Sequence, residues 1–203
     1  MRPALQNDRV LAGLWLTMLA GMAFGVFDVL APLRLARLGA TGLLIAGTFL
    51  AAAAIEGTLS PLAGWLADRK SAVRPITISL VAAAAVSFFT PMLGMVWLLV
   101  PVLMVGMPAF GALFAPAMSL LSKGAHLKNL DQGLAFGLGN LAWASGQAFA
   151  AAGGGALAQA KSDLFPYSLL VVACLATLPV IRLGAEKTRR REGTGRVVEG
   201  EPG

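Results

Sequence analysis

The sequence is poor in charge, in cysteine and in histidine. Charged side chains make up only 13% of its 203 residues, against roughly 25% in a typical soluble domain. So few charges beside 57% hydrophobic residues exclude an ordinary water-soluble globule, because that much apolar surface needs lipid around it. One cysteine, Cys174, excludes a disulfide framework, and with one histidine it leaves no metal-ligand cluster. We therefore predict no metal and no cofactor.

The basic residues are distributed in a way that argues against nucleic acid as a partner. The formal net charge is +6, but Lys and Arg lie at the ends of apolar runs rather than in a patch with interleaved aromatic residues. Charges at the ends of apolar runs are typical of membrane proteins, where they set the topology. The partner that this pattern indicates is the lipid bilayer.

Six apolar runs are long enough, or nearly so, to cross a hydrocarbon core of about 30 Å. The sequence therefore predicts an all-α, polytopic membrane protein with six transmembrane helices, in a domain over 10–183 between a short N-terminus (1–9) and a disordered tail (184–203). The predicted spans are Val10–Leu33, Leu43–Leu66, Pro75–Met92, Met95–Leu121, Gly133–Ala158 and Phe165–Ile181.

The distribution of Lys and Arg predicts the orientation. With a cytoplasmic N-terminus, thirteen basic residues fall on the cytoplasmic side and three, Arg34, Arg37 and Lys161, on the other. The positive-inside rule therefore places both termini in the cytoplasm. The Ala- and Gly-rich composition suits a bacterium with a GC-rich genome, so we expect a multi-pass protein of the cytoplasmic membrane. The basic residues of the tail are either solvated or in contact with anionic lipid.

A short charged turn between the second and third runs carries the family resemblance. It reads Gly64-Trp65-Leu66-Ala67-Asp68-Arg69-Lys70, with a further basic residue at Arg74. The pattern resembles the signature loop of the major facilitator superfamily, Gly-x-Leu-x-Asp-Arg-x-Gly-Arg-Arg, at the same place in a six-helix bundle. Ser71 and Ala72 depart from it, as is commoner in the second copy of the loop. The resemblance therefore implies the C-terminal half of a transporter, and Pro61 with Leu38-Gly39-Ala40 resembles the drug-efflux type.

In that family the loop acts as a latch that holds one conformation. The resemblance implies this role for Gly64, Leu66, Asp68, Arg69 and Arg74, with Asp68 near the start of the fifth helix of a partner half, at Asp131-Gln132-Gly133. A carboxylate in that position is stabilised by free amides and by the helix dipole. The alternative is that these charges are solvated and only set the topology.

Two acids lie within predicted spans, and ionisable groups at that depth usually face a cavity or a partner. Glu56 is near the middle of the second span, and Asp28 is near the end of the first. Glu56 is a candidate proton site. Its alternative role is a protonated side chain bonded to a carbonyl near Pro61. Asp28 is a candidate for the same site, or an interfacial residue.

The fifth span carries a polar and aromatic stripe. Asn140, Trp143 and Gln147 are spaced three and four apart, which places them on one helix face. Such a stripe suits a water-filled cavity for amphipathic solutes, or ordinary hydrogen bonding between helices. The pairs Gly21/Gly25 and Gly133/Gly137 predict close helix packing.

These residues predict a membrane protein without enzymatic activity. Gly137-Leu138-Gly139-Asn140-Leu141-Ala142 fits a dinucleotide fingerprint, but it lies in a span and follows no strand. We expect a secondary transporter or half of one, exporting small amphipathic solutes with protons as the coupling ion. Its second six-helix half would be another copy or a separate chain. The alternative is a non-transporting remnant, or an accessory subunit that needs a partner half.

Overall fold

The computed structural model describes residues 8–69, 73–127 and 130–198, without the side chains of 63, 64, 66–69 and 185–198. Within these ranges the chain is helical apart from short connections, as its many Ala and Leu residues favour. The elements are α1 (Asp8–Arg37), α2 (Gly42–Arg69), α3 (Val73–Phe89), the 3-10 turn η1 (Thr90–Met92), α4 (Val96–His126), α5 (Gln132–Ala160) and α6 (Leu164–Val198).

Five of the described helical segments are long and apolar enough to cross a membrane. They are Asp8–Arg37, Gly42–Leu62, Val73–Met92, Val96–His126 and Leu164–Gly184. The helix α5 has the length for a crossing, but its glycines and its polar residues Asn140 and Gln147 make it less apolar. An all-α membrane fold with several crossings is therefore confirmed, and the crossing by α5 stays a prediction.

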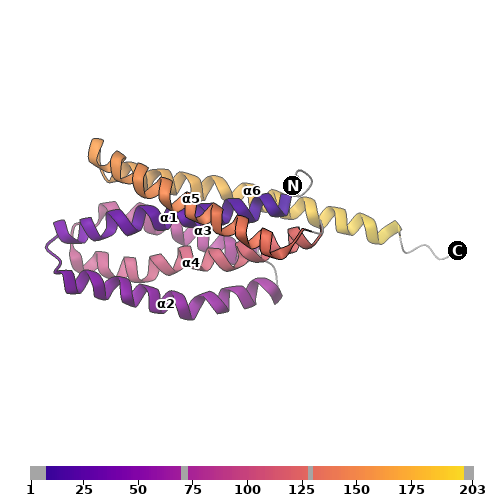
Figure 1. The fold of residues 1–203 in the computed structure, drawn as a ribbon, viewed down its shortest axis with the longest axis horizontal. Helices are drawn as coiled ribbons and strands as arrows, with labels where there is room; N and C mark the ends of the chain where they lie inside the picture. Colours follow the sequence, from indigo (N-terminus) through magenta and orange to yellow (C-terminus); the bar gives the residue numbers. More distant parts are fainter. Residues whose placement is uncertain (1–7, 70–72, 128–129, 199–203) are drawn as a thin grey trace.

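The last helix is longer than the sixth predicted span. Its backbone stays helical to Val198, although we expected a disordered tail from residue 184. The physical reason lies in the composition: residues 185–192 are rich in Ala, Glu, Lys and Arg, all good helix formers. In Figure 1 this end of α6 projects well beyond the other helices.

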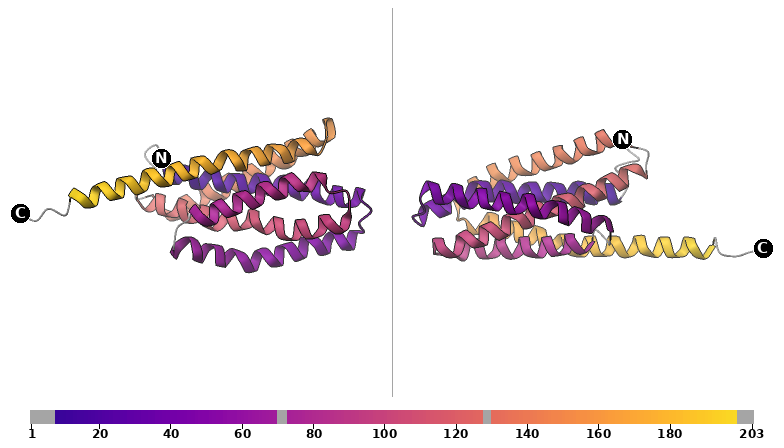
Figure 2. Two further views of the ribbon diagram at one scale, coloured as in Figure 1. Left: turned by 180° about the vertical axis from the view of Figure 1, so that it is seen from behind. Right: turned by 90° about the horizontal axis from the view of Figure 1, so that it is seen from below.

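The helices form two layers (Figure 1). In the layer that we call the front layer, α5 packs on α1, α1 on α4, and α4 on α2. Behind it α6 and α3 pack on each other, and α3 also contacts α4; Figure 2 shows this layer from behind. The helices α1 and α4 are therefore the centre of the bundle, while α5 and α2 lie on its flanks.

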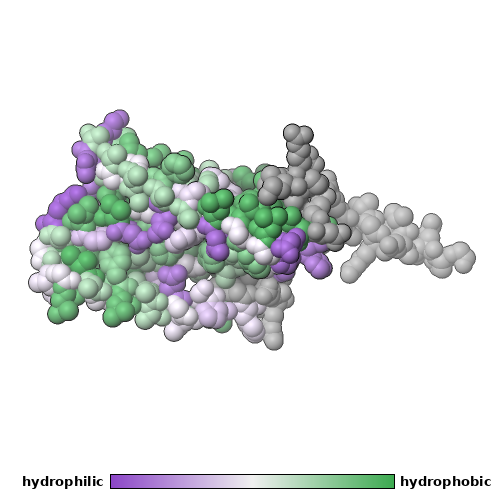
Figure 3. Space-filling view, viewed as in Figure 1, coloured by the Kyte–Doolittle hydropathy of each residue, from purple (hydrophilic) through white to green (hydrophobic). Residues whose placement is uncertain are grey.

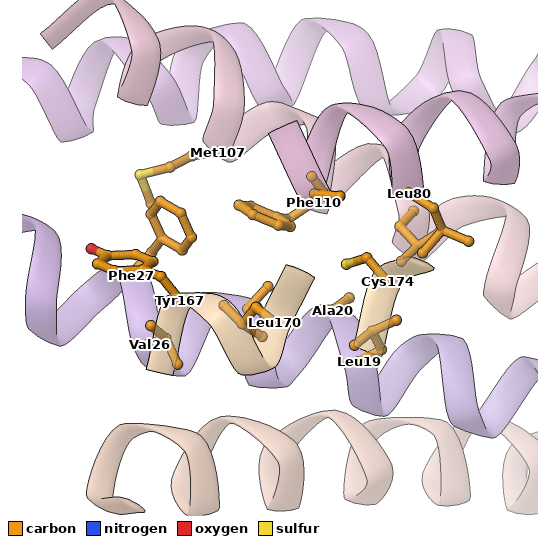
Figure 4. Close-up of a cluster of buried hydrophobic side chains, with 14 of the residues drawn as sticks. Leu19, Ala20, Val26, Phe27, Leu80, Met107, Phe110, Tyr167, Leu170 and Cys174 are labelled. Atoms are coloured by element: carbon orange, nitrogen blue, oxygen red, sulfur yellow. The ribbon is translucent and has the colours of Figure 1, made fainter. Parts of the chain in front are cut away.

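The core between the layers is built on three aromatic rings. The ring centroid of Phe27 in α1 lies 5.0 Å from that of Phe110 in α4 and 5.1 Å from that of Tyr167 in α6. All three side chains are almost fully buried, among residues such as Leu170 and Cys174 (Figure 4). Tilted and edge-on ring pairs of this kind add to the stabilisation from burial. The core thereby ties the centre of the front layer to α6.

Glycines allow α1 and α5 to approach closely. A methyl group on Gly21 would collide with the main-chain oxygen of Trp143, and one on Gly25 with that of Gln147. The close packing predicted for Gly21 and Gly25 is therefore confirmed. Gly137, predicted as part of a similar contact, faces open space. The motif spacing alone does not say which glycine meets a neighbour.

A glycine turn ends α1. Gly39 has a φ of +88°, a conformation that favours glycine, and its N–H bonds the carbonyl of Ala36 while that of Ala40 bonds the carbonyl of Leu35. These two bonds make a Schellman motif, which satisfies the carbonyls at the end of a helix. We call this end of the bundle the Gly39 end.

A charged cluster joins three connections at the Gly39 end. Arg37 donates to Oδ2 of Asp163 at 2.7 Å, and Arg34 lies 3.8 Å from the same oxygen. Arg34 also donates to the main-chain oxygens of Pro91 and Leu93, at 2.6 and 3.0 Å. Asp163 is buried and Arg34 is largely buried, so these contacts are worth more than an exposed ion pair. The cluster anchors α1 to α6 and to the connection between α3 and α4.

Candidate functional site

The charged turn lies where the sequence places it, between α2 and α3. The α2 backbone is helical through Arg69, and α3 begins at Val73, with Arg74 exposed in its first turn. The side chains of the motif residues Gly64, Leu66, Asp68 and Arg69 lie outside the description, as do residues 70–72 altogether. Their role as a latch therefore stays a prediction.

The start of α5, the predicted target of the latch, is described. Asp131 caps the helix, with its Oδ1 accepting from the N–H of Leu134 at 3.0 Å. Gln132 is tied to α4, because its Oε1 accepts from the hydroxyl of Ser122 at 2.9 Å. One amide of this helix start is thus already satisfied within the chain. A partner's carboxylate would have to use the others.

Asp28 is the first member of a polar group on the front layer. It lies on α1, and its side chain is exposed although most residues around it on that helix are buried. Its Oδ2 accepts from Nε2 of Gln147 on α5, at 3.2 Å. Gln147 is in turn placed by the close contact of its main chain with Gly25. Two of the predicted site residues, 119 positions apart in sequence, are therefore brought together.

Glu56 lies on the opposite flank, on α2. Its half-buried side chain reaches across to α4 and lies against the Cα of Gly111. The side chains of Asp28 and Glu56 are near enough for their charges to interact. Glu56 therefore packs against α4, while Asp28 is bonded to α5.

The remaining members of the predicted stripe are less closely joined to this group. Asn140 is exposed on α5, two helical turns before Gln147. Among the described residues no contact joins it to Asp28 or Glu56. Trp143 is half-buried, and its main chain packs against Gly21. Of the stripe, Gln147 is the residue that meets a carboxyl group.

The molecular surface also has a polar region on this layer. Figure 3 shows a band of hydrophilic surface over α1, from the Gly39 end towards the middle of the face, with apolar surface on both sides. A separate groove between α2 and α4 near the Gly39 end is lined by Thr41, Leu43, Leu44, Gly47, Thr48, Val100 and Met104. That groove contains neither of the two carboxyl groups. The polar group of the face is therefore Asp28, Gln147 and Glu56.

Sequence reasoning missed two features of this layer. Gly111 was not singled out, because a glycine among prolines in an apolar helix gives no sign of the side chain that it will meet. The ion pair between Arg37 and Asp163 was also missed, although both residues flank predicted spans on the same side of the membrane. Their position on one side of the bilayer was the available signal.

Comparisons with known proteins place the chain in a family. A family model described as the Major Facilitator Superfamily matches residues 2–151, which is most of the chain. No curated protein and no solved structure gives a significant match. The family consists of transporters built from six-helix halves. That is consistent with the prediction that the chain is not an enzyme.

Proposed function

Because the chain belongs to the Major Facilitator Superfamily, we propose that it is a secondary active transporter, or half of one. In our proposal it exports small amphipathic solutes, with protons as the coupling ion. The observation that carries the proposal is the presence of two carboxyl groups on long apolar helices: Asp28, bonded to Gln147, and Glu56, packed against Gly111. Carboxyl groups at membrane depth are costly, and they mark ion and substrate pathways.

We propose that this face meets a second six-helix half. In the family two halves are related by an axis along the membrane normal, and the substrate binds between them near the midplane. The helix α2 supports this arrangement, because only 11% of its most apolar stretch is buried within the chain. The second half is another copy of this chain or a separate one. Both termini are cytoplasmic in this proposal, in the cell membrane of a bacterium.

The competing function is that of a non-transporting remnant or an accessory subunit. Reconstitution of the purified chain in liposomes separates the two, with a fluorescent lipophilic dye as the solute and an imposed pH gradient. We expect gradient-driven dye movement above that of protein-free liposomes. Movement no faster than in protein-free liposomes would favour the accessory role.

The latch proposal has its own test. Asp68→Lys reverses the charge that we propose meets the start of the partner's α5, where the helix dipole favours an anion. We expect unchanged expression and a changed rate of dye movement in the same liposomes. Asp8→Lys, a charge reversal in the exposed first turn of α1, is the matched control. Equal rates for Asp68→Lys and the wild type would contradict the latch.

A further inference from the structure

The contact between Glu56 and Gly111 gives α4 a part in the proposed proton site. Gly111 follows Phe110, whose ring points into the core towards Phe27 (Figure 4). Successive residues of a helix are turned by about 100°. Gly111 therefore faces α2, where the Glu56 side chain crosses it.

The space for Glu56 exists because residue 111 has no side chain. A methyl group on Gly111 would lie on the Oε1, Cδ and Cγ atoms of Glu56, so the whole end of that side chain would have to move. A glycine inside a helix is less favourable than an alanine. The Glu56 side chain occupies the space beside this glycine, between α2 and α4.

The charges around this contact are few. The acid within the predicted span of α1 is Asp28. The helix α4 carries no ionisable side chain between Val96 and Ser122, and α3, which touches α2, carries only Arg74 at its start. The position of the Glu56 carboxyl group relative to Asp28 therefore depends on packing against α4. Among the described residues of these helices, no ion pair with a basic side chain holds it there.

We propose that Gly111 is the positioning residue for Glu56. Because residue 111 has no side chain, the Glu56 carboxyl group fits into the interface of α2 and α4. This deepens the proposed function and rests on it for the link to transport. A movement of α4 would then change the position of the Glu56 carboxyl group. A larger residue at 111 displaces the group without removing it.

The test is the infrared spectrum of the purified chain in lipid. The carboxyl band of Glu56 is identified by its loss in Glu56→Gln. We expect Gly111→Ala to shift this band and to leave the backbone bands unchanged. The matched control is Gly106→Ala on the same helix, because a methyl group there meets Val86 of α3 instead. Gly106→Ala should lower stability and leave the Glu56 band in place.

Transport provides the second reading. In liposomes we expect Gly111→Ala to reduce the effect of the pH gradient on dye movement at least about tenfold, and to add nothing in the Glu56→Gln background. An unshifted Glu56 band in Gly111→Ala, or an equal shift in Gly106→Ala, would overturn the positioning role. A shifted band in a chain that moves no dye would support the positioning and contradict the proposed function instead.

Discussion

The helices α1 and α2 are alike in sequence and opposite in their surroundings. Both are long and apolar, and each carries one acid within its predicted span and a proline in its second half. Yet 61% of the most apolar stretch of α1 is buried within the chain, against 11% for α2. Composition therefore says that a helix crosses the membrane. It does not say whether the helix lies at the centre of the bundle or on its flank.

The difference follows from what the glycines of each helix meet. Those at 21 and 25 in α1 lie against the main chain of α5, while Gly47 and Gly57 in α2 face open space. Small residues let helices approach in lipid, where packing replaces the hydrophobic drive of water. The close packing of α1 on α5 stabilises the six-helix bundle itself. The open surface of α2 is left for another partner.

The largest effect that we expect is from adding bulk to a glycine of α1. Gly25→Leu forces α1 away from α5, because a side chain there meets the main-chain oxygen of Gln147. We expect a loss of about 3 kcal/mol in the free energy of unfolding, as for a strongly overpacked core. The measurement is unfolding in a denaturing detergent, followed by circular dichroism.

Gly47→Leu on α2 is the matched control for that substitution. No atom of the described residues lies within 4 Å of a methyl group placed on Gly47, and leucine is a better helix former than glycine. We expect no loss of stability from it. A similar loss in both variants would mean that the two helices are packed alike.

A smaller effect should come from the anchor of α1 at the Gly39 end. Asp163→Asn removes the charge that Arg37 binds at 2.7 Å, beside the largely buried Arg34. Hydrogen bonds to charged groups contribute about 1.5–3 kcal/mol, so we expect a loss of about 2 kcal/mol in unfolding free energy. Thermal unfolding in mild detergent measures it.

The corresponding anchor of α2 is weaker. The hydroxyl of Thr41 accepts from the N–H of Leu44 at 3.3 Å in an exposed position. Replacing such a cap by alanine costs about 1 kcal/mol or less. Thr41→Ala should therefore be milder than Asp163→Asn, and the reverse order would refute the contrast between the two helices.

An effect as small as that of Thr41→Ala is expected towards the other end of α1. Trp15 donates from Nε1 to Oγ1 of Thr177 in α6, at 2.9 Å. Trp15→Phe should cost about 1 kcal/mol, the net worth of one hydrogen bond. A double-mutant cycle with Thr177→Val isolates this bond, and a coupling energy of zero would show that it contributes nothing.

The sequence was sufficient to predict the helices, except the extension of α6 beyond residue 184, and it predicted part of the site. Charges such as Arg37 and Lys161 mark the helix ends because they do not enter lipid, and the turn at Gly39 is local. The hydrogen bond between Asp28 and Gln147 could have been predicted, since both were singled out as polar residues within predicted spans. The contact of Glu56 with Gly111 was not, because it depends on which helices become neighbours. That choice is made by long-range packing.

We propose that the face formed by α1, α2, α4 and α5 couples solute movement to protons. The most direct test of this proposal is Glu56→Gln, which keeps the size of the side chain and removes its ability to bind and release a proton. In liposomes with an imposed pH gradient, we predict dye movement by the wild-type chain that depends on the gradient. In Glu56→Gln we predict movement that no longer depends on it. Gradient dependence that survives in the folded variant would contradict the claim and leave Glu56 a structural role.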